Sequence, residues 1–461
     1  MNTGTACSRS LKLFLRGQTG RSSHCYKPCY RSLSTTTTVP SLSKAVQSPP
    51  RLRRSKSTSG SSSKRLAYDF NNPGNDVGPV KFDYVYLRDS CNCPLCVDPS
   101  TRQKLFSTAE ISLDITSREV VRSDDGVTRI RWRNDIPGYD ENHESVYSLE
   151  FFLNGANARY DTAAQVYWDR ALMQREVNWL AYDDYIRDEK VLLQALLQLK
   201  KYGLVFLKDV PQGDERAVER IGERIGVLRD TFYGRTWDVR SMVDAKNVAY
   251  TSQRLGLHMD LLYFADPPGL QLLHCLRNTT EGGSSLFADS FRAASELLAA
   301  KPNCGTALKE FPVTWHYRND SQHYHYTRPT VELERYMAKS SRQASISNVN
   351  WSPPFQAPFE VNNGTHDNGQ HLRLYLHSAR LLAEKMEADE ALFEMRLEEG
   401  QCVIFNNRRV VHGRRAFDAG SGERWLKGAY LDGDAFRSRF RVLSEKHGPE
   451  YVVHQEVPSE R

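Results

Sequence analysis

The sequence predicts a mainly β protein with helical insertions, folded as a barrel or a sandwich. Beyond Gly203, short, mostly apolar runs of strand length recur, such as Leu204–Leu207 and Leu270–Leu276. Turn segments rich in glycine and proline, such as Asp266–Gly269, separate these runs. The other predicted strands are Val248–Thr251, Val313–His316, Leu372–Leu376, Gln401–Phe405 and Trp425–Leu431, and the predicted helical insertions are Phe291–Ala300 and Ser378–Phe393. Many short strands punctuated in this way indicate a barrel or a sandwich.

Residues 1–66 are predicted to be a basic leader followed by a disordered linker. Thirteen Lys and Arg, from Arg9 to Arg65, precede the first acidic residue, Asp69, and Ser, Thr and Pro fill the spaces between them. A basic, serine-rich segment without acidic residues is typical of a mitochondrial transit peptide, although a disordered basic tail has the same composition. We therefore expect a mitochondrial protein, with a cytoplasmic location as the alternative.

The rest of the chain is mildly acidic. Of the 62 Lys and Arg in the sequence, 49 follow the leader and are outnumbered by 56 Asp and Glu, which gives that part a net charge of −7. This balance does not suggest a nucleic-acid partner. No segment of the sequence approaches the roughly 18 consecutive apolar residues that a membrane span needs.

Residues 67–165 are predicted to form a small N-terminal domain that binds a metal. Alternating apolar and polar residues in Val127–Arg133 suggest β-structure. Cys91, Cys93 and Cys96 place three thiols within six residues, and in a reducing compartment such a cluster is more often a metal site than a set of disulfides. A tetrahedral zinc ion needs a fourth ligand from elsewhere in the chain. The site is expected to be structural, because a closed site leaves no position for a substrate.

The larger domain, residues 175–445, carries a candidate metal site of a different kind. His258-Met-Asp260 lies just after an apolar run, and in extended chain residues i and i+2 project to the same face. His412, in a distant His-Gly-Arg motif, is placed to supply a second imidazole. Two neutral imidazoles and one carboxylate leave three coordination positions open, which suits iron(II) that must bind a co-substrate and dioxygen, whereas zinc is more often four-coordinate.

Arg424 adds a candidate anion-binding group. It lies twelve residues after His412, within an apolar strand where an unpaired guanidinium would be costly. A planar guanidinium in that position can hold a carboxylate through two hydrogen bonds. The alternative is a salt bridge to an acidic residue of the protein itself.

At these residues the chain resembles a known family, the 2-oxoglutarate-dependent oxygenases of the taurine dioxygenase superfamily, and within it the γ-butyrobetaine dioxygenases most of all. The resemblance covers roughly residues 82–445. The matching stretches are Thr231–Trp237, Asn247–Thr251, Pro267–Cys275, His412–Arg415 and Gly428–Tyr430. The resemblance implies a double-stranded β-helix (jelly-roll) fold. It also implies Fe(II) held by His258, Asp260 and His412, with 2-oxoglutarate as co-substrate and ascorbate as a candidate reductant.

The same resemblance assigns binding residues. Arg424 would hold the distal carboxylate of 2-oxoglutarate, with a further contact from Asn247. Ser285 is a third assigned contact, for which the adjacent Ser284 is the alternative. A trimethylammonium group has no N–H to donate, so aromatic faces must bind it through cation–π attraction. The aromatic cage implied by the family consists of Tyr233, Trp237, Tyr250 and Tyr430.

For the small domain, the resemblance implies a zinc site of three cysteines and one histidine. His143 would be the fourth ligand, joining Cys91, Cys93 and Cys96. In this family the small domain also takes part in dimer formation and covers the active site. A homodimer is therefore the expected assembly.

The function implied is the hydroxylation of γ-butyrobetaine to L-carnitine, with succinate and carbon dioxide as co-products, in carnitine biosynthesis. One departure concerns the acidic end of the substrate, because Asn350–Gln356 differs from the Asn-Asn stretch and following Arg that the family usually carries there. Leu261–Phe264 is somewhat closer to trimethyllysine dioxygenase, which is one alternative. The others are an oxygenase of this superfamily acting on another small acid and, from a different class, a non-catalytic zinc-containing β-barrel that only binds partners.

Overall fold

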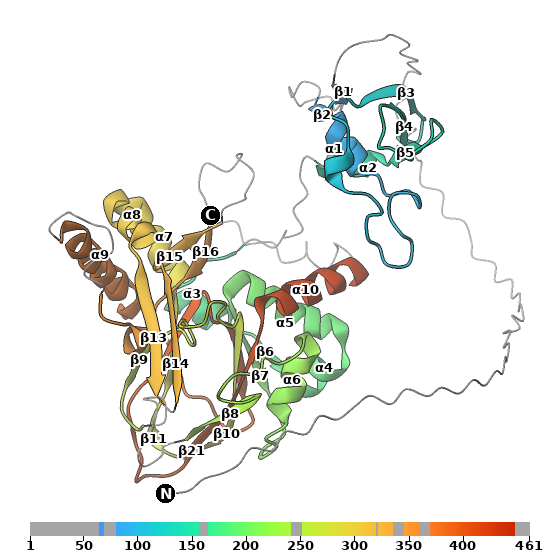
Figure 1. Cartoon of the computed structure of the whole chain (residues 1–461). Coiled ribbons are helices and arrows are strands. Elements are labelled where there is room, and N and C mark those ends of the chain that lie inside the picture. The colour runs from blue at the N-terminus through green and yellow to red at the C-terminus, as the bar shows by residue number, and fades with distance from the viewer. Residues whose placement is uncertain are drawn as a thin grey trace, which may run out of the picture. The chain divides into compact units, whose positions relative to one another are not determined.

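The computed structural model describes most of the chain after the leader (Figure 1). The described residues are 64–68, 80–155, 165–240, 251–319, 321–334, 345–359 and 369–447. They belong to two compact units, the smaller Met1–Asn157 and the larger Ala158–Arg461. Asn247, Tyr250 and the predicted strand Val248–Thr251, apart from its last residue, lie outside the described residues, as does almost all of the leader.

The smaller unit consists of two antiparallel sheets and short helices. In β4 (Thr128–Arg133) the side chains alternate between buried and exposed, as the sequence pattern predicts, and Ile130 and Trp132 face the interior. Asp83 caps the first helix, because its carboxylate accepts a hydrogen bond from the backbone N–H of Val85. One sheet has the order β3-β4-β5, and the other pairs β1 with β2. The remaining elements are β1 (Arg65–Tyr68), β2 (Val80–Asp83), α1 (Tyr84–Asp89), η1 (Thr108–Glu110), β3 (Thr116–Arg122), β5 (Glu144–Tyr147) and α2 (Leu149–Gly155).

The larger unit is built around two sheets whose strands are antiparallel except for one parallel pair at an edge. The six-stranded sheet has the order β6-β7-β18-β10-β21-β8, and the four-stranded sheet has the order β17-β12-β19-β9. The strands of the first sheet are β6 (Trp179–Ala181), β7 (Leu204–Lys208), β8 (Thr236–Arg240), β10 (Leu270–Asn278), β18 (Cys402–Asn406) and β21 (Arg424–Leu431). Those of the second are β9 (Leu255–His258), β12 (Ser285–Asp289), β17 (Phe393–Met395) and β19 (Val410–Arg414). Side chains from both sheets line one cavity.

Two groups of helices surround these sheets (Figure 1). The first group packs on the six-stranded sheet and joins it in one apolar core. It consists of α4 (Tyr182–Arg187), α5 (Glu189–Tyr202), α6 (Ala217–Ile225) and α10 (Gly433–His447). The second group packs together and consists of α7 (Ser290–Ala300), α8 (Pro302–Glu310) and α9 (Gln370–Glu387). The other elements are α3 (Arg170–Glu176), β11 (Glu281–Gly282), β13 (Val313–Asn319), β14 (Gln322–Arg328), β15 (Val331–Leu333), β16 (Ile346–Val349), η3 (Pro353–Phe355) and β20 (Phe417–Asp418).

The predicted mainly β class with helical insertions is confirmed, but one predicted strand is wrong. Leu372–Leu376 lies inside α9, and that helix ends at Glu387 rather than at Phe393, which begins β17. Three leucines at alternate positions resemble a strand, yet burial follows the helical period. The buried residues of α9 are Tyr375, Ser378, Ala379, Leu382 and Met386.

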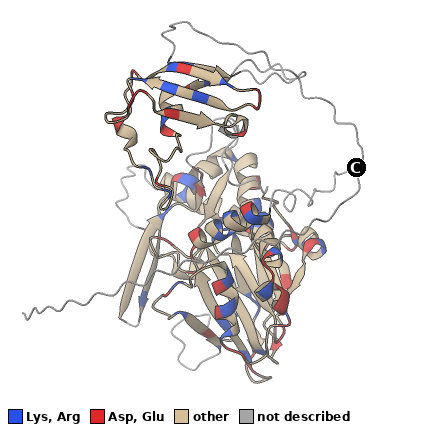
Figure 2. Ribbon diagram, turned by 90° about the vertical axis from the view of Figure 1, so that its right-hand side faces the viewer, with Lys and Arg blue, Asp and Glu red and all other residues tan. Residues whose placement is uncertain are grey.

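The helices are amphipathic and carry mixed charge. Figure 2 shows basic and acidic residues interspersed along the helices of the larger unit. Arg292 and Glu296, one turn apart on α7, form such a pair, with Nε and Oε1 separated by 3.0 Å. None of the described helices combines the length and hydrophobicity that crossing a membrane requires.

Candidate active site

Two neighbouring strands bring the predicted metal ligands together. His258 ends β9 and pairs with His412 in β19, and the centres of the two imidazole rings are 4.2 Å apart. Asp260 follows two residues after His258, with its Oδ1 atom 3.4 Å from Nε2 of His258. The ligand atoms of the three side chains lie within 4.8 Å of one another. His412, which the sequence marks only by its His-Gly-Arg motif, lies within strand β19.

The protonation states of these groups suit a divalent metal. Nδ1 of His258 donates to the backbone oxygen of Gly256 at 2.9 Å, which leaves the lone pair of Nε2 facing the other two groups. Burial lowers the pKa of His412 to about 3, so its imidazole is neutral. Burial opposes ionisation of Asp260, but the two neighbouring histidines and the hydrogen bond from Tyr430 outweigh it and hold the pKa of this carboxyl well below its usual range. Two neutral imidazoles and a carboxylate are a donor set that fits iron(II).

Asn407 holds the backbone of the carboxylate ligand in place. Its Oδ1 accepts from the backbone N–H of Asp260 at 2.9 Å, and its Nδ2 donates to the backbone oxygen of Asp260 at 3.0 Å. The next residue, Leu261, has a φ of 59°, a conformation that residues other than glycine seldom adopt. Sequence reasoning missed the role of Asn407, although a completely buried asparagine directly after a core strand is the kind of signal that suggests such a clamp.

One cavity reaches from the metal ligands to both ends of β21. Its basic end is lined by Arg424, at the start of β21, and by Arg414 and Ser285 on the facing sheet. Its aromatic end is lined by Tyr430, near the end of β21, and by Trp237. Residues at even spacing along a strand share a face, so Arg424 and Tyr430 both point into the cavity.

Arg424 is a buried cation without a protein counter-ion. Only 6% of its surface is exposed, and among the described residues none accepts a hydrogen bond from its guanidinium or forms an ion pair with it. Burial, followed by repulsion from Arg414, lowers its pKa to about 10, so the group remains charged at neutral pH. The protein salt bridge that the sequence left open is not formed within the described part of the chain. A guanidinium in this state is suited to an anion that enters from outside.

The two serines that the sequence left equivalent differ in the structure. Ser285 is buried in β12 and lines the cavity, whereas Ser284 is half-buried and is not part of the lining. Arg414 faces Ser285 across the strand pair and also lines the cavity, a position that the sequence motif contains but to which no role was assigned. Asn247, the remaining predicted contact of the co-substrate, lies outside the described residues.

The aromatic end is formed by stacked rings. Tyr430 and Trp237 lie parallel, with ring centres 3.9 Å apart and planes 23° apart. Gly428, opposite Trp237 in the sheet, makes room for this stack, because a Cβ at that position would overlap the indole. Tyr233 also lines the cavity, so three of the four predicted cage residues lie in it, while Tyr250 is outside the described residues.

Residues 350–356 present an aromatic rather than a polar group to the cavity. The side chain of Asn350 is completely buried, and its Oδ1 accepts from Nη2 of Arg408 at 2.7 Å. Phe355, from the same segment, lines the cavity and packs edge-on against Tyr263, with ring centres 5.4 Å apart. The sequence identified this segment as unusual but did not predict Phe355 and Tyr263 as wall residues.

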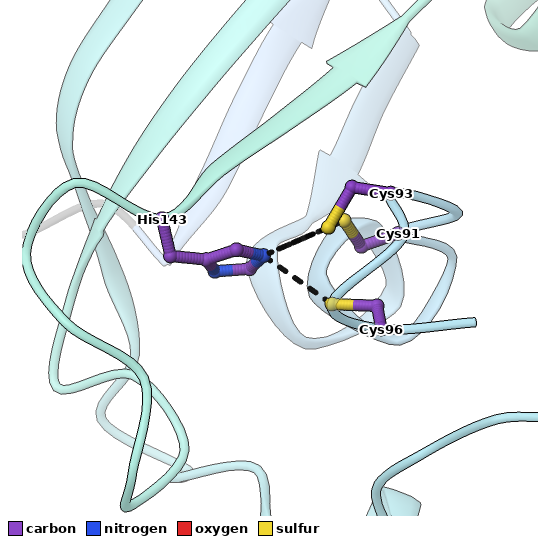
Figure 3. Close-up of side chains that lie close together, drawn as sticks. All are labelled: Cys91, Cys93, Cys96 and His143. Atoms are coloured by element: carbon purple, nitrogen blue, oxygen red, sulfur yellow. Dashed lines mark hydrogen bonds between the residues drawn. The ribbon is translucent and has the colours of Figure 1, made fainter. Parts of the chain in front are cut away.

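In the smaller unit, three thiols and an imidazole face one another (Figure 3). Cys91 follows the end of α1, and His143 immediately precedes β5. The Nε2 atom of His143 lies 3.7 Å from Sγ of Cys91, 3.5 Å from Sγ of Cys93 and 3.3 Å from Sγ of Cys96. Three thiols and one imidazole converging in this way are a donor set for tetrahedral zinc.

A buried ion pair between Arg88 and Asp135 contacts His143 and Cys96 of this cluster. Nδ1 of His143 lies 2.7 Å from Oδ2 of Asp135, whose Oδ1 accepts from Nε of Arg88 at 2.5 Å. Arg88 is completely buried, and its Nη1 donates to Sγ of Cys96 at 3.3 Å. Burial opposes protonation of His143, but Asp135 and the thiols raise its pKa to about 10. The cluster therefore provides an environment that stabilises positive charge.

Comparison with known proteins matches both units. The model of the taurine catabolism dioxygenase TauD, TfdA family matches residues 172–430, and the model of the gamma-butyrobetaine hydroxylase-like N-terminal region matches residues 61–152. The chain is 37% identical over 383 residues to dioxygenase str8 of Strobilurus tenacellus, which covers 79% of this chain and 85% of that protein. It is 32% identical over 376 residues to the gamma-butyrobetaine dioxygenase of Pseudomonas sp. strain AK-1, covering 78% and 90% of the two chains. It is 28% identical over 371 residues to the mitochondrial trimethyllysine dioxygenase of Rattus norvegicus, covering 79% and 83%.

Proposed function

Because the chain belongs to the taurine catabolism dioxygenase TauD, TfdA family, we propose that it hydroxylates γ-butyrobetaine to L-carnitine. The chain is a 2-oxoglutarate-dependent dioxygenase, and this class of enzyme uses Fe(II). Membership of an enzyme family argues against the non-catalytic binding module that the sequence left open. The observation that supports the choice of substrate best is the stack of Tyr430 and Trp237 beside the metal ligands.

The roles of the residues follow from their positions. His258, Asp260 and His412 would hold iron(II), and Arg424 would bind the far carboxylate of 2-oxoglutarate at the basic end. When bound, iron(II) with 2-oxoglutarate and dioxygen supplies the hydroxylation of a C–H bond and releases succinate and carbon dioxide. At the aromatic end, Tyr430 and Trp237 would hold the trimethylammonium group, and their contribution to the rate would be orientation of one C–H bond.

The test is a turnover assay of the full-length protein with Fe(II), ascorbate and 2-oxoglutarate. Succinate and hydroxylated product are measured separately with γ-butyrobetaine, with trimethyllysine and with neither. We expect γ-butyrobetaine to stimulate succinate release and to yield L-carnitine in equal amounts. Stimulation by neither compound would overturn the assignment to carnitine synthesis, whereas the background decarboxylation of 2-oxoglutarate would still report a working iron site.

Trimethyllysine is the second candidate, and Tyr263 is the observation that favours it. The segment Leu261–Phe264, whose sequence resembles trimethyllysine dioxygenases, contributes Tyr263 to the cavity wall, with its hydroxyl 3.4 Å from that of Tyr233. Two adjacent hydroxyls can accept and donate hydrogen bonds to a larger polar head group. Hydroxylation of trimethyllysine, without turnover of γ-butyrobetaine, is the outcome that would select this candidate.

The glycine beneath the aromatic stack gives a selective test of the cage. In Gly428→Ala the new methyl group would push Trp237 away from Tyr430. Loss of one cation–π contact is worth about 0.5–2 kcal/mol, so we expect the KM for γ-butyrobetaine to rise about 2- to 30-fold. The KM for 2-oxoglutarate, measured in the same assay, is the internal control and should not change. Equal rises in both constants would indicate general distortion of the sheet instead.

For the smaller unit, the proposal is a structural zinc ion held by Cys91, Cys93, Cys96 and His143. Zinc bound by the purified full-length protein should amount to one ion, released by a chelator together with loss of structure in this unit. A protein that folds without zinc, and does not take it up, would contradict the proposal.

Asp135 should increase the affinity of the cluster for zinc, although it is not itself a ligand. In Asp135→Asn the carboxylate no longer orients His143, and Arg88 loses its buried counter-ion. We expect zinc affinity, measured by chelator competition, to fall about 10- to 100-fold, and the unit to lose about 3–5 kcal/mol of stability. The control is Asp114→Asn, because that carboxylate is exposed and pairs only with the exposed Lys64 among the described residues. Unchanged affinity in Asp135→Asn would show that the buried pair does not serve the metal.

Location and assembly complete the proposal. Residues 1–66 would direct the protein to mitochondria, which a fluorescent fusion with and without these residues would test in cells. The assembly would be a homodimer, which sedimentation of the purified protein would test. A fusion protein that stays in the cytoplasm would contradict the mitochondrial location. A monomer at micromolar concentration would contradict the homodimer.

A further inference from the structure

We propose that Tyr430 determines which oxygen of Asp260 faces the metal, and so joins the substrate cage to the metal site. The hydroxyl of Tyr430 donates to Oδ2 of Asp260 at 2.6 Å. The other carboxylate oxygen, Oδ1, lies 3.4 Å from Nε2 of His258, on the side of the remaining ligands. The two oxygens of one ligand therefore have different partners, and only Tyr430 among the described residues donates to Oδ2.

The consequence for coordination follows from what a carboxylate can do. A free carboxylate can bind a metal through one oxygen or through both, and the second mode would fill a further position. Asn407 fixes the backbone of Asp260 but does not contact its carboxylate oxygens. With Oδ2 engaged by Tyr430, a single oxygen is left for the metal. Three positions then stay open for 2-oxoglutarate and dioxygen.

The same ring is a wall of the substrate pocket. Tyr430 is 3% exposed and stacks on Trp237, which is opposite Gly428 in the sheet. Since the ring and its hydroxyl form one rigid group, a cation held against the face of the ring lies at a fixed distance from the carboxylate ligand. The role of Tyr430 towards Asp260 stands on the metal site alone, whereas its role in positioning substrate rests on the proposed function.

The direct test is metal affinity in the absence of both substrates. Full-length wild type and Tyr430→Phe, which keeps the ring and removes the hydroxyl, are titrated with Mn(II), and free Mn(II) is measured by electron paramagnetic resonance. Mn(II) prefers nitrogen and oxygen ligands, so the thiol cluster does not interfere. We expect about tenfold weaker Mn(II) binding by Tyr430→Phe, the lower end of the effect of outer-shell partners. Equal affinities would overturn the proposal.

A matched control separates this effect from loss of any buried hydroxyl. Tyr185 is completely buried and donates to the backbone oxygen of Ile221 at 3.0 Å, so Tyr185→Phe also removes one buried hydrogen bond, but on the helical side of the sheet. Tyr185→Phe should lower thermal stability and leave Mn(II) affinity unchanged. If Tyr430→Phe does not fold, Tyr430→Met, which also lacks the donor and adapts to the space, repeats the measurement.

The second measurement concerns the coupling between decarboxylation of 2-oxoglutarate and hydroxylation of the substrate. With γ-butyrobetaine as the probe, Tyr430→Phe should release more succinate per hydroxylated product than the wild type, because the ligand and the substrate are no longer held by one group. A ratio equal to that of the wild type would refute the link between cage and metal. If the wild type does not turn over γ-butyrobetaine, the proposed substrate fails, while the Mn(II) titration still decides the role of Tyr430.

Discussion

His258→Ala is expected to abolish turnover and Mn(II) binding by the larger unit. The substitution removes one of three donors whose ligand atoms lie within 4.8 Å of one another, and leaves only Asp260 and His412. Succinate release should fall by more than about 100-fold, since loss of outer-shell partners alone costs 10- to 100-fold. The measurements are succinate release with Fe(II) and 2-oxoglutarate, and the Mn(II) titration.

The matched control for this substitution is another buried histidine of the same unit. His274 in β10 is completely buried, lies outside the cavity lining, and neither ring nitrogen has a hydrogen-bond partner among the described residues. Burial lowers its pKa to about 4, so it is neutral, as His412 is. His274→Leu should leave Mn(II) affinity unchanged. Wild-type turnover by His258→Ala would rule out the assigned iron site.

Arg424→Gln is expected to raise the KM for 2-oxoglutarate by about 100-fold or more. A bidentate guanidinium–carboxylate contact contains two charge-assisted hydrogen bonds, each worth about 1.5–3 kcal/mol, and glutamine retains at most one neutral donor. Arg424→Lys keeps the charge without the planar fork and should give an intermediate value. Under the proposed function the primary substrate binds at the aromatic end of the cavity, so its KM should change little.

Stability distinguishes this role from a structural one. A buried arginine paired with a protein carboxylate destabilises the fold when it is removed, but Arg424 has no such partner among the described residues. Thermal unfolding of Arg424→Gln without 2-oxoglutarate should therefore occur at or above the wild-type temperature. The control is Arg415→Gln, which removes an exposed guanidinium paired with Glu394 and should leave the KM unchanged. An unaltered KM in Arg424→Gln would show that the co-substrate binds elsewhere.

Local sequence patterns predicted the parts of the site that depend on short separations. His258 and Asp260 are two residues apart, and Cys91, Cys93 and Cys96 lie within six, so strand or turn geometry alone brings each set together. Strands of the core were also predictable, because their apolar runs are bounded by glycine and proline.

The contacts that the sequence did not reveal are those fixed by tertiary packing. Asn407 reaches Asp260 across 147 residues, and the hydroxyl of Tyr430 reaches it across 170. Neither contact can be predicted from the periodicity of the sequence, because both contacts depend on how the two sheets face each other. Packing can also override a local sequence pattern. In α9 the alternating leucines of Leu372–Leu376 predict a strand, but the segment is helical because burial against the core follows the helical period.

Strand β21 fixes the separation between the basic end and the aromatic end of the cavity. Arg424 and Tyr430 are six residues apart on its inner face, a span of roughly 20 Å that the backbone fixes and that side-chain exchange cannot alter. A sequence change at the aromatic end can therefore alter which substrate is accepted while the basic end keeps its place. Insertion of a single residue would turn one of the two side chains to the opposite face. The site can thus diversify by substitution but not by a change in the length of this strand.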